Sequence, residues 1–575
     1  MDSVTVPTPL PDAAQPSPGA SPPVGSAAEP FQDLVEHARH TRVVVIGGGI
    51  AGLVAAWECV KVGMSVTLVE ASDRLGGMIG STRLAGLDLE TGVTCWSTRD
   101  GAVRKLVAEV LPGAAIVSPR DDREWIAGLA KGAAAPLPAD QVLGIPANPW
   151  DESVRRVIGW DGTWRAYLDR LRPPLTIGAQ RSAGRLVRSR MGAKVRDRLV
   201  APLTVDRFGL DPDDVDVEIA APGLSTALTR TGWLGGAVAD VRVGATGSAI
   251  EGLDGGMPQL VAALARRLAE RGATVHTGAR ATSLTRAGAA WTVGLAAVGD
   301  APESPVPVPP DGPDSPVVER ARNERVETPV PPDGPDFPVV ERAPFDRLRD
   351  HERDETPVPP DGPVPADLLA DAVIVATDEG AARALLAPAL GVPAFADVAA
   401  AGIAREVVTM VVDAPELDAA PRGAHVHAVP GTLRATGLVH ETARWEWLAR
   451  EAGTGRHVLR VAFGAPGVAP ATATLSDAEA AALAVAEASA LLGTHLGERA
   501  LVGAHRDVFT LVPPASALGQ RDRAATARAA VGRNHGIAAV GAWLSGSGLA
   551  AVVADARDET DRLRRQVLWG AAATD

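Results

Sequence analysis

One stretch, residues 42–77 (RVVVIGGGIAGLVAAWECVKVGMSVTLVEASDRLGG), constrains the fold of this chain more than any other. The apolar residues Val43–Ile46 predict a buried strand, which runs directly into three glycines spaced G-x-G-x-x-G. A helical pattern follows, and then a second apolar strand, Ser65–Val69, which ends at the acid Glu70. Strand, glycine turn, helix, strand and acid in this order predict a Rossmann βαβ unit, which binds a dinucleotide.

Each part of this unit has a physical role in that binding. Gly47 allows the tight turn off the strand, Gly49 has no side chain to keep the backbone from the pyrophosphate, and Gly52 lets the helix pack closely on the sheet. The first turn of the helix presents free N–H groups and a positive dipole end to the phosphates. Glu70 stands where a carboxylate accepts hydrogen bonds from the adenosine ribose, and it would repel the extra phosphate of NADP. We therefore predict cofactor contacts from Gly47, Gly49, Ile50, Ala51, Gly52, Glu70 and Ala71.

The residues after this acid narrow the choice of cofactor. The chain continues as Arg74-Leu75-Gly76-Gly77, a basic loop with paired glycines. Here it resembles the flavin-containing amine oxidase superfamily, in which the sequence E-x-x-x-R-x-G-G marks FAD rather than NAD binding. The resemblance implies that Arg74 and the backbone of Gly76 and Gly77 lie against the phosphates and the flavin side of FAD.

A second cofactor signature lies near the C-terminal end, in residues 536–558 (GIAAVGAWLSGSGLAAVVADARD). An apolar strand leads into a Ser/Gly loop, and a helix begins after it, so that N–H groups are free for a pyrophosphate or the carbonyl edge of a flavin. The segment is similar to the superfamily pattern G-x-x-x-x-G-x-G-[IL]-x-x-x-[VI]. We therefore predict further contacts from Gly541, Ser547, Gly548 and Leu549.

Residues 92–99 (GVTCWSTR), after a predicted hairpin over 82–90, point to one branch of the superfamily. They resemble the G-A-E-x-F-x-T-R-like segment of the protoporphyrinogen and coproporphyrinogen oxidases, with Thr94 where that segment has an acid. Residues 512–520 also lack the aromatic residue and the histidine of the relatives. The resemblance implies cofactor contacts from Gly92 and, through the backbone of a strand that returns to the FAD domain, from Val275.

The composition along the chain suggests its division. The N-terminus is rich in Pro, Ala, Ser and Gly without the basic and apolar regions of a signal peptide. A segment in the middle repeats VPPDGP three times and has too few apolar residues to bury a core. We expect an α/β protein with a Rossmann-type FAD-binding domain, a mixed-sheet substrate domain and a helical insertion. The predicted parts are a disordered tail (1–40), FAD-binding segments (41–125, 246–298, 366–388 and 506–575), a substrate and helical-insertion region (126–245), a disordered insert (299–365) and a substrate domain (389–505).

Charge and hydropathy exclude some partners. The net charge of −14 disfavours nucleic acid, and no apolar run is long enough to span a bilayer. The two cysteines indicate no disulfide framework, which favours a cytoplasmic protein. Residues 177–198 predict a strongly basic helix, either a solvated face or a surface for an anionic, polycarboxylate substrate. The resemblance implies that this helical part covers the substrate cavity and touches the membrane peripherally.

The resemblance implies an FAD-dependent porphyrinogen oxidase of haem biosynthesis, which takes coproporphyrinogen III or protoporphyrinogen IX and passes electrons to oxygen. Two alternatives stay open: another FAD-dependent amine oxidase or desaturase, and a relative that binds FAD without turnover. The eleven histidines are scattered without metal-ligand spacing, so we predict no metal. No side-chain constellation indicates a catalytic residue, which fits chemistry carried by the flavin.

Overall fold

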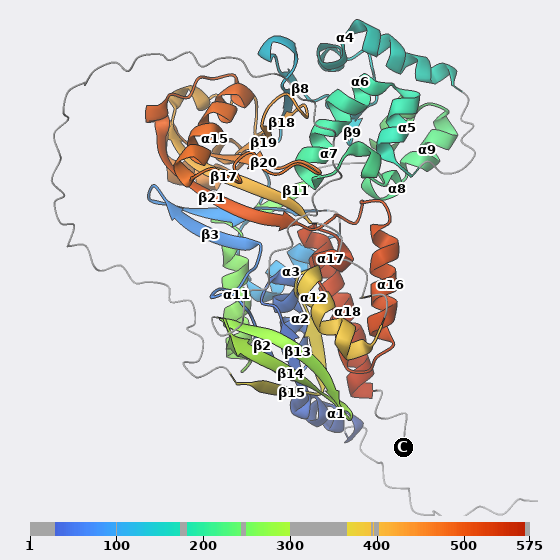
Figure 1. Cartoon of the computed structure of the whole chain (residues 1–575), viewed down its shortest axis with the longest axis vertical. Coiled ribbons are helices and arrows are strands. Elements are labelled where there is room, and N and C mark those ends of the chain that lie inside the picture. Colours follow the sequence, from blue (N-terminus) through green and yellow to red (C-terminus); the bar gives the residue numbers. More distant parts are fainter. Residues whose placement is uncertain are drawn as a thin grey trace, which may run out of the picture.

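The computed structural model describes residues 29–98, 100–172, 181–242, 249–298, 365–392, 395 and 402–569 (Figure 1). A parallel sheet with its helices fills the lower half of Figure 1, and a mixed sheet and a group of helices lie side by side above it. This is the predicted α/β class, with a Rossmann-type part, a mixed sheet and a helical insertion.

Five parallel strands form the first sheet, in the order β12-β2-β1-β16-β22. They are β1 Arg42–Ile46, β2 Ser65–Val69, β12 Thr274–His276, β16 Ala372–Val375 and β22 Ile537–Ala539. The strands read as continuous apolar runs because both faces of the sheet are covered. One face packs with α2 Ile50–Lys61, α3 Ala102–Val110, α11 Pro258–Glu270 and α18 Leu549–Trp569. On the other face lie β13 Ala279–Ala287, β14 Ala290–Ala297, α12 Glu379–Leu390 and α16 Gln520–Gly532.

The mixed sheet has seven strands in the order β21-β17-β20-β19-β18-β7-β8. They are β7 Glu124–Ala127, β8 Ala135–Pro136, β17 Ile403–Asp413, β18 His425–Ala428, β19 Ala435–His440, β20 Arg456–Phe463 and β21 Leu501–Leu511. Helix α15, Asp477–Leu492, covers the apolar face and is capped by Ser476 and Glu479 in a capping box. The opposite face carries charged side chains.

The helical insertion packs around its own apolar core. Its main elements are α4 Glu152–Tyr167, α5 Ala183–Arg190, α7 Ala201–Phe208, α9 Leu224–Thr231 and α10 Leu234–Arg242. A hairpin, β3 Ile79–Leu84 and β4 Leu87–Gly92, and the short strands β5 Trp96–Ser97, β6 Ile116–Val117 and β11 Ile250–Leu253 lie between the parts. Among the described residues, no helix combines the length and the apolar character needed to cross a membrane.

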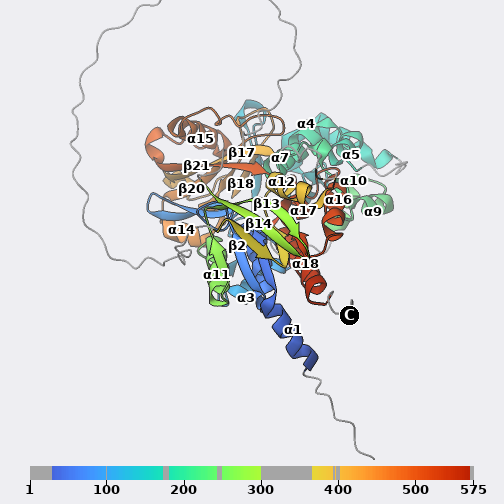
Figure 2. The same ribbon diagram turned by 60° about the horizontal axis from the view of Figure 1, so that its bottom comes forward.

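Two local expectations are wrong. The tail predicted for 1–40 ends earlier, because residues 29–40 form helix α1, which packs on α18 through Ala38 and a contact between His37 Nε2 and the Val567 carbonyl at 3.4 Å (Figure 2). Residues 1–28 lie outside the described part. The basic helix predicted for 177–198 is interrupted at Gly192, whose φ of +100° is incompatible with a continuous α-helix.

Strand pairing also shifts the expected division of the chain. The boundary at 125/126 falls inside β7, and the boundary at 505/506 falls inside β21, and both strands belong to the mixed sheet. The partner of β14 is β15, Asp367–Ala370, while the next strand, β16, enters the parallel sheet instead. The insert expected at 299–365 lies outside the described residues except at its last position.

Candidate cofactor and substrate site

The carboxyl ends of three parallel strands meet at one edge of the five-stranded sheet. Gly47 donates to the Val69 carbonyl (2.7 Å), and Ala376 donates to the Ile46 carbonyl (2.7 Å). Gly47 has a φ of +109°, and a Cβ there would lie 2.5 Å from the Ala376 carbonyl oxygen, so only glycine fits. Ligands of doubly wound sheets bind at this edge.

Two glycine loops face each other at this edge and form a cradle of backbone. Gly76 donates to the Gly48 carbonyl at 2.9 Å, and Gly49 and Gly76 form a parallel bridge. A Cβ on Gly49 would meet only the Gly77 Cα, at 4.0 Å, so the space beside Gly49 is open. A side chain there would fill the cradle.

The N-terminus of α2 opens onto the cradle. Gly49 is its N-cap residue, no side chain caps it, and its first turn has no acidic residue, so that Ile50 and Ala51 begin a helix whose N–H groups are free for an anion. Gly52 sits against the preceding turn, where a Cβ would lie 1.9 Å from the Gly47 carbonyl oxygen. This open cradle beside an uncapped helix fits the pyrophosphate of a dinucleotide.

Glu70 and Arg74 brace the two loops from within. The Glu70 carboxylate accepts hydrogen bonds from Gly48 N (2.6 Å) and Ser72 N (2.7 Å). The backbone N–H of Glu70 donates to the His276 carbonyl (2.8 Å). Arg74 donates to the carbonyls of Gly77 (3.0 Å) and Ile79 (3.3 Å). The Arg74 guanidinium thus holds its own loop in shape, and its predicted contact with the phosphates stays a prediction.

The remaining residues of the prediction lie around this edge with different roles. Val275 pairs with Leu68 at the outer strand of the sheet, and Ala71 follows Glu70, half-buried. Gly92 lies in the turn after β4, where its φ is +72° and a Cβ would lie 1.9 Å from the Met78 carbonyl oxygen. Its carbonyl accepts a hydrogen bond from Arg460 of the mixed sheet.

The C-terminal segment brings a second helix N-terminus beside the first. Gly541 has a φ of +124°, and a short helix, α17 Ala542–Ser545, follows it and precedes the Ser/Gly loop. Ser547 and Gly548 are exposed, and nothing lies within 4 Å of a Cβ on Gly548. Leu549 begins α18 and shares the apolar cluster of Ala51 and Ile50.

The mixed sheet contributes a buried charge network that the sequence did not reveal. Asp206 of α7 accepts from His425 Nε2 (2.7 Å), His427 Nδ1 (2.8 Å) and the Arg405 guanidinium (2.7 Å). Burial alone would raise the pKa of the Asp206 carboxyl, but hydrogen bonds from the two histidines hold it well below its usual range. The pattern His-x-His on a strand, which puts two rings on one face, was the signal that could have found it.

This network also offers the one set of metal-ligand atoms found among the described residues. Glu124, His425 and His427 place one ligand atom each within 4.8 Å of one another. Two guanidinium groups already neutralise the carboxylates, since Arg207 pairs with Glu124 and Arg405 pairs with Asp206. Burial and the neighbouring imidazole lower the pKa of His425 to about 4, while the two carboxylates raise that of His427 despite its burial. These ion pairs hold the carboxylates of the cluster in place, and the absence of a metal stays a prediction.

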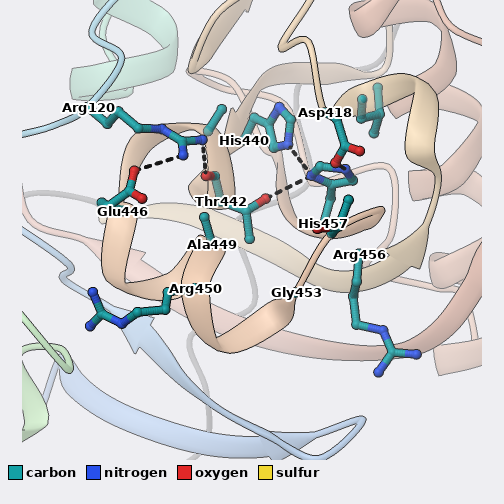
Figure 3. Close-up of a pocket in the computed structure, with 13 residues that line it drawn as sticks. Arg120, Asp418, His440, Thr442, Glu446, Ala449, Arg450, Gly453, Arg456 and His457 are labelled. Atoms are coloured by element: carbon teal, nitrogen blue, oxygen red, sulfur yellow. Dashed lines mark hydrogen bonds and ion pairs between the residues drawn. The ribbon is translucent and has the colours of Figure 1, made fainter.

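A pocket of about 480 Å³ opens on the mixed sheet, away from the cradle (Figure 3). Inside it, His457 Nδ1 lies 3.1 Å from both His440 Nε2 and Thr442 Oγ1, and His457 Nε2 lies 3.2 Å from the Asp418 carboxylate. At the rim, Arg120 pairs with Glu446, and Arg450 and Arg456 pair with acids outside the drawn set. None of the predicted cofactor residues lines this pocket.

Sequence comparisons match the parts that form the cradle. Residues 50–300 match the family of flavin containing amine oxidoreductases, and residues 6–85 match that of the pyridine nucleotide-disulphide oxidoreductases. A coproporphyrinogen III oxidase of Propionibacterium freudenreichii subsp. freudenreichii is 29% identical over 187 residues, which are 32% of this chain and 35% of that protein. One from Mycobacterium bovis is 28% identical over 229 residues, 39% of this chain and 50% of that protein. The chain thus spans between a third and a half of the length of these curated relatives.

Solved structures share the fold over nearly the whole chain. A protein from Exiguobacterium sp. 255-15, provisionally named as a protoporphyrinogen oxidase, has a TM-score of 0.69 at 19% identity and covers 91% of this chain and 99% of its own. A putrescine oxidase bound to putrescine has a TM-score of 0.55 at 15% identity, with 92% of this chain and 99% of its own covered. At these identities the likeness concerns the fold.

Proposed function

We propose that this chain is a member of the flavin-containing amine oxidoreductase superfamily that oxidises a porphyrinogen in the cytoplasm, with FAD as its cofactor and oxygen as the electron acceptor. The observation that carries the proposal is the agreement between several relatives named coproporphyrinogen III oxidase and a backbone cradle that fits a dinucleotide. The substrate is coproporphyrinogen III or protoporphyrinogen IX. The mixed sheet and the helical insertion form its side of the site.

In this proposal the chain contributes position and exclusion of water, and a bound flavin would supply the acceptor for hydride equivalents of the macrocycle. The cradle at Gly49 and Gly77, with the N-termini of α2 and α18, would hold the pyrophosphate. Glu70 would hold the glycine loop through Gly48 N and leave oxygen lone pairs for the ribose. The Gly92 turn and Gly541 would lie on the flavin side.

The test is anaerobic reduction of the bound flavin, followed at its visible absorption band. Coproporphyrinogen III, protoporphyrinogen IX and putrescine are offered separately, and air is then admitted. We expect one of the two porphyrinogens to bleach the flavin and to yield a fluorescent porphyrin and hydrogen peroxide. Bleaching by the amine alone would transfer the proposal to an amine oxidase, and bleaching by none would favour a relative without turnover.

Substrate carboxylates are proposed to meet the basic face of α5. Arg185 and Arg188 are exposed and form no ion pair within the described part of the chain, whereas Arg190 of the same helix is buried against Asp169 at 2.6 Å. Reversing both exposed charges to Glu should raise KM for the four-carboxylate coproporphyrinogen several-fold and leave FAD binding unchanged. The control is Arg266→Glu on α11. Equal KM values in the wild type, the double variant and the control would indicate that this face of α5 is a solvated surface without contact to the substrate.

A peripheral membrane contact is proposed for the aromatic end of α4. Trp150, Trp160, Trp164 and Tyr167 form edge-to-face contacts with centroids 4.9–6.3 Å apart, and Trp160 is 63% exposed. Trp and Tyr rings favour the membrane–water interface, and Arg155 and Arg170, which stack on these rings, suit anionic headgroups. Co-sedimentation with phosphatidylglycerol vesicles should be lost in Trp160→Ser, and retention of binding would contradict the contact.

A further inference from the structure

A small polar cavity lies where the mixed sheet meets the turn that follows β4. Its volume of about 10 Å³ leaves room for roughly one water molecule. The lining residues come from β4 and the following turn, from β17 and β20, and from the segment of α13, Glu441–Arg444, and α14, Glu446–Ala452. They are Leu89, Glu90, Thr94, Thr409, Glu441, Trp447, Leu448, Val458 and Arg460.

Three side chains of this lining have polar atoms without a partner among the described residues. They are Arg460 Nε, Glu441 Oε2 and Thr409 Oγ1, on residues that are 9%, 4% and 1% exposed. An unpaired polar atom in such a place costs about 1–3 kcal/mol, so a donor–acceptor set of this kind calls for a bound water or another polar group. The cavity is therefore a built polar site.

Arg460 reaches from the middle of the mixed sheet to the turn near the cradle. Its guanidinium donates to the Gly92 carbonyl at 3.1 Å, and it lies 3.5 Å from the Glu441 carboxylate. Because Arg460 is largely buried within the strand HVLRVAF, its charge needs a partner in the protein, which Glu441 supplies. The Gly92 carbonyl and the Glu441 carboxylate thus hold the Arg460 guanidinium in a fixed position.

The turn at Gly92 connects Arg460 to the glycine cradle through contacts with Met78. Val93 donates to the Met78 carbonyl at 3.0 Å, and Gly92 packs so tightly on that carbonyl that no Cβ fits. Met78 directly follows Gly77, the residue that faces Gly49 across the cradle. A chain of contacts therefore runs from the mixed sheet to the cofactor edge.

We propose that Arg460 is a positioning residue of the flavin site, which fixes the Gly92 turn, and through it the loop at Gly77, from the mixed sheet. The proposal rests on the proposed function, because it takes the cradle as the FAD site. Glu441 is the ion-pair partner of Arg460 in this arrangement. Burial raises the pKa of the neighbouring Glu90 carboxyl to about 8, which keeps Glu90 mostly uncharged at neutral pH and leaves Arg460 to Glu441. Glu90 and Glu441 line the same cavity as Thr94, which stands where the similar segment of the porphyrinogen oxidases has an acid.

The test compares Arg460→Gln and Arg460→Lys with Arg456→Gln in the full-length protein. Arg456 lies on the same strand, and within the described part of the chain its side-chain hydrogen bonds go to Asp413, at 2.8 and 3.2 Å. The readouts are the dissociation constant of FAD, from fluorescence titration of the apoprotein, and the reduction potential of the bound flavin. We expect Arg460→Gln to raise the dissociation constant of FAD at least tenfold and to change the reduction potential of the flavin. Arg460→Lys should give values between those of Arg460→Gln and the wild type. Arg456→Gln should keep its dissociation constant within twofold of the wild type.

A merely structural arginine would give another pattern. In that case Arg460→Gln would lower the melting temperature but leave the dissociation constant and the potential of the folded protein equal to those of Arg456→Gln, which overturns the proposal. Should Arg460→Gln fail to fold, unchanged values in Arg460→Lys overturn it equally. If the wild type binds FAD but oxidises no porphyrinogen, the proposed function is wrong, but the proposal for Arg460 still stands. The reason is that neither the dissociation constant of FAD nor the reduction potential depends on a substrate.

Discussion

The glycine cradle and the charged face of the mixed sheet satisfy their polar groups in different ways. In the cradle the two loops meet through backbone groups, as between Gly76 N and the Gly48 carbonyl, and the side chains that brace them, Glu70 and Arg74, come from the same stretch of sequence. On the mixed sheet the contacts are made by side chains, and Asp206 alone joins groups from strands β17, β18 and β19. A backbone site can thus be built by residues adjacent in sequence, whereas a side-chain network needs distant segments.

The two regions should therefore respond differently to substitution. A bulky residue in the cradle takes up space that belongs to the ligand, so the cofactor is lost while the fold survives. A neutralised charge on the sheet leaves its partner buried and unpaired, so the whole fold loses stability. The predictions below test this contrast.

The largest effect is expected from Gly49→Leu. The backbone at Gly49 has a φ of −69°, which any residue adopts, and the space beside its Cα is open, so the leucine side chain enters the cradle. We expect the purified protein to be colourless, with the FAD stoichiometry near zero by absorption after denaturation and a far-ultraviolet CD spectrum like that of the wild type.

Gly497→Leu is the matched control for this variant. Gly497 has a φ of −71° and no atom within 4 Å of a Cβ, but it precedes β21 on the mixed sheet. It should keep its FAD. A yellow Gly49→Leu protein with full stoichiometry would show that the cradle is not the cofactor site.

A smaller effect, of about 3–5 kcal/mol in the free energy of unfolding, is expected from Asp206→Asn. The loss follows because Arg405 remains buried without its counter-charge, and the two histidines meet a neutral amide in place of the carboxylate. Urea unfolding measures it, and FAD affinity of the folded fraction should change little. Asp161→Asn removes an exposed partner of Lys194 and should match the wild type. A loss in Asp206→Asn no larger than that of Asp161→Asn would refute the network as a source of stability.

The smallest effect concerns pH and His440. Burial and the charges of His457 and Arg120 lower the pKa of His440 to about 3, whereas in the unfolded chain it is about 6.5. Below pH 6.5 the unfolded chain therefore binds a proton that the folded protein refuses, so this stability is complete above pH 6.5 and is lost as the pH falls. By pH 4 the loss should reach about 3 kcal/mol.

His440→Asn should make the unfolding free energy less dependent on pH between 7 and 4, as measured by urea titration at each pH. The control His40→Asn removes a solvent-exposed histidine of α1 and should keep the wild-type slope. A slope in His440→Asn as steep as that of the wild type would place the acid sensitivity elsewhere, for example on His425.

Much of the cofactor half could be predicted from the sequence because its signals are local. Strand, glycine turn, helix and acid are contiguous, and the structure has β1, α2 and β2 where the pattern predicts them. The contact predicted between Arg74 and the phosphates stays a prediction, and the structure adds hydrogen bonds from its guanidinium to two loop carbonyls. Nothing in the residues adjacent to an arginine decides which acceptor its long side chain meets.

The mixed sheet was harder to predict, although a mixed-sheet substrate domain was expected over 389–505, where β17 and β20 lie. Its boundaries were missed because β7 and β21 are joined to it only by pairing with segments far along the chain. The histidines at 425 and 427 were overlooked because their partner, Asp206, is 219 and 221 residues away. Arg460, a charged residue inside the strand HVLRVAF, indicated a buried polar contact, but the sequence did not predict that its partners are Gly92 and Glu441.

The sequence by itself determined the βαβ unit and the glycine positions, because a turn that approaches a pyrophosphate depends on the φ angles and side-chain volumes of a few adjacent residues. The tertiary structure decided which strands close each sheet, which acid neutralises which buried base, and how Arg460 reaches the Gly92 turn. Those choices depend on burial, since a charge is forced to find a partner only after the folded chain has removed it from water.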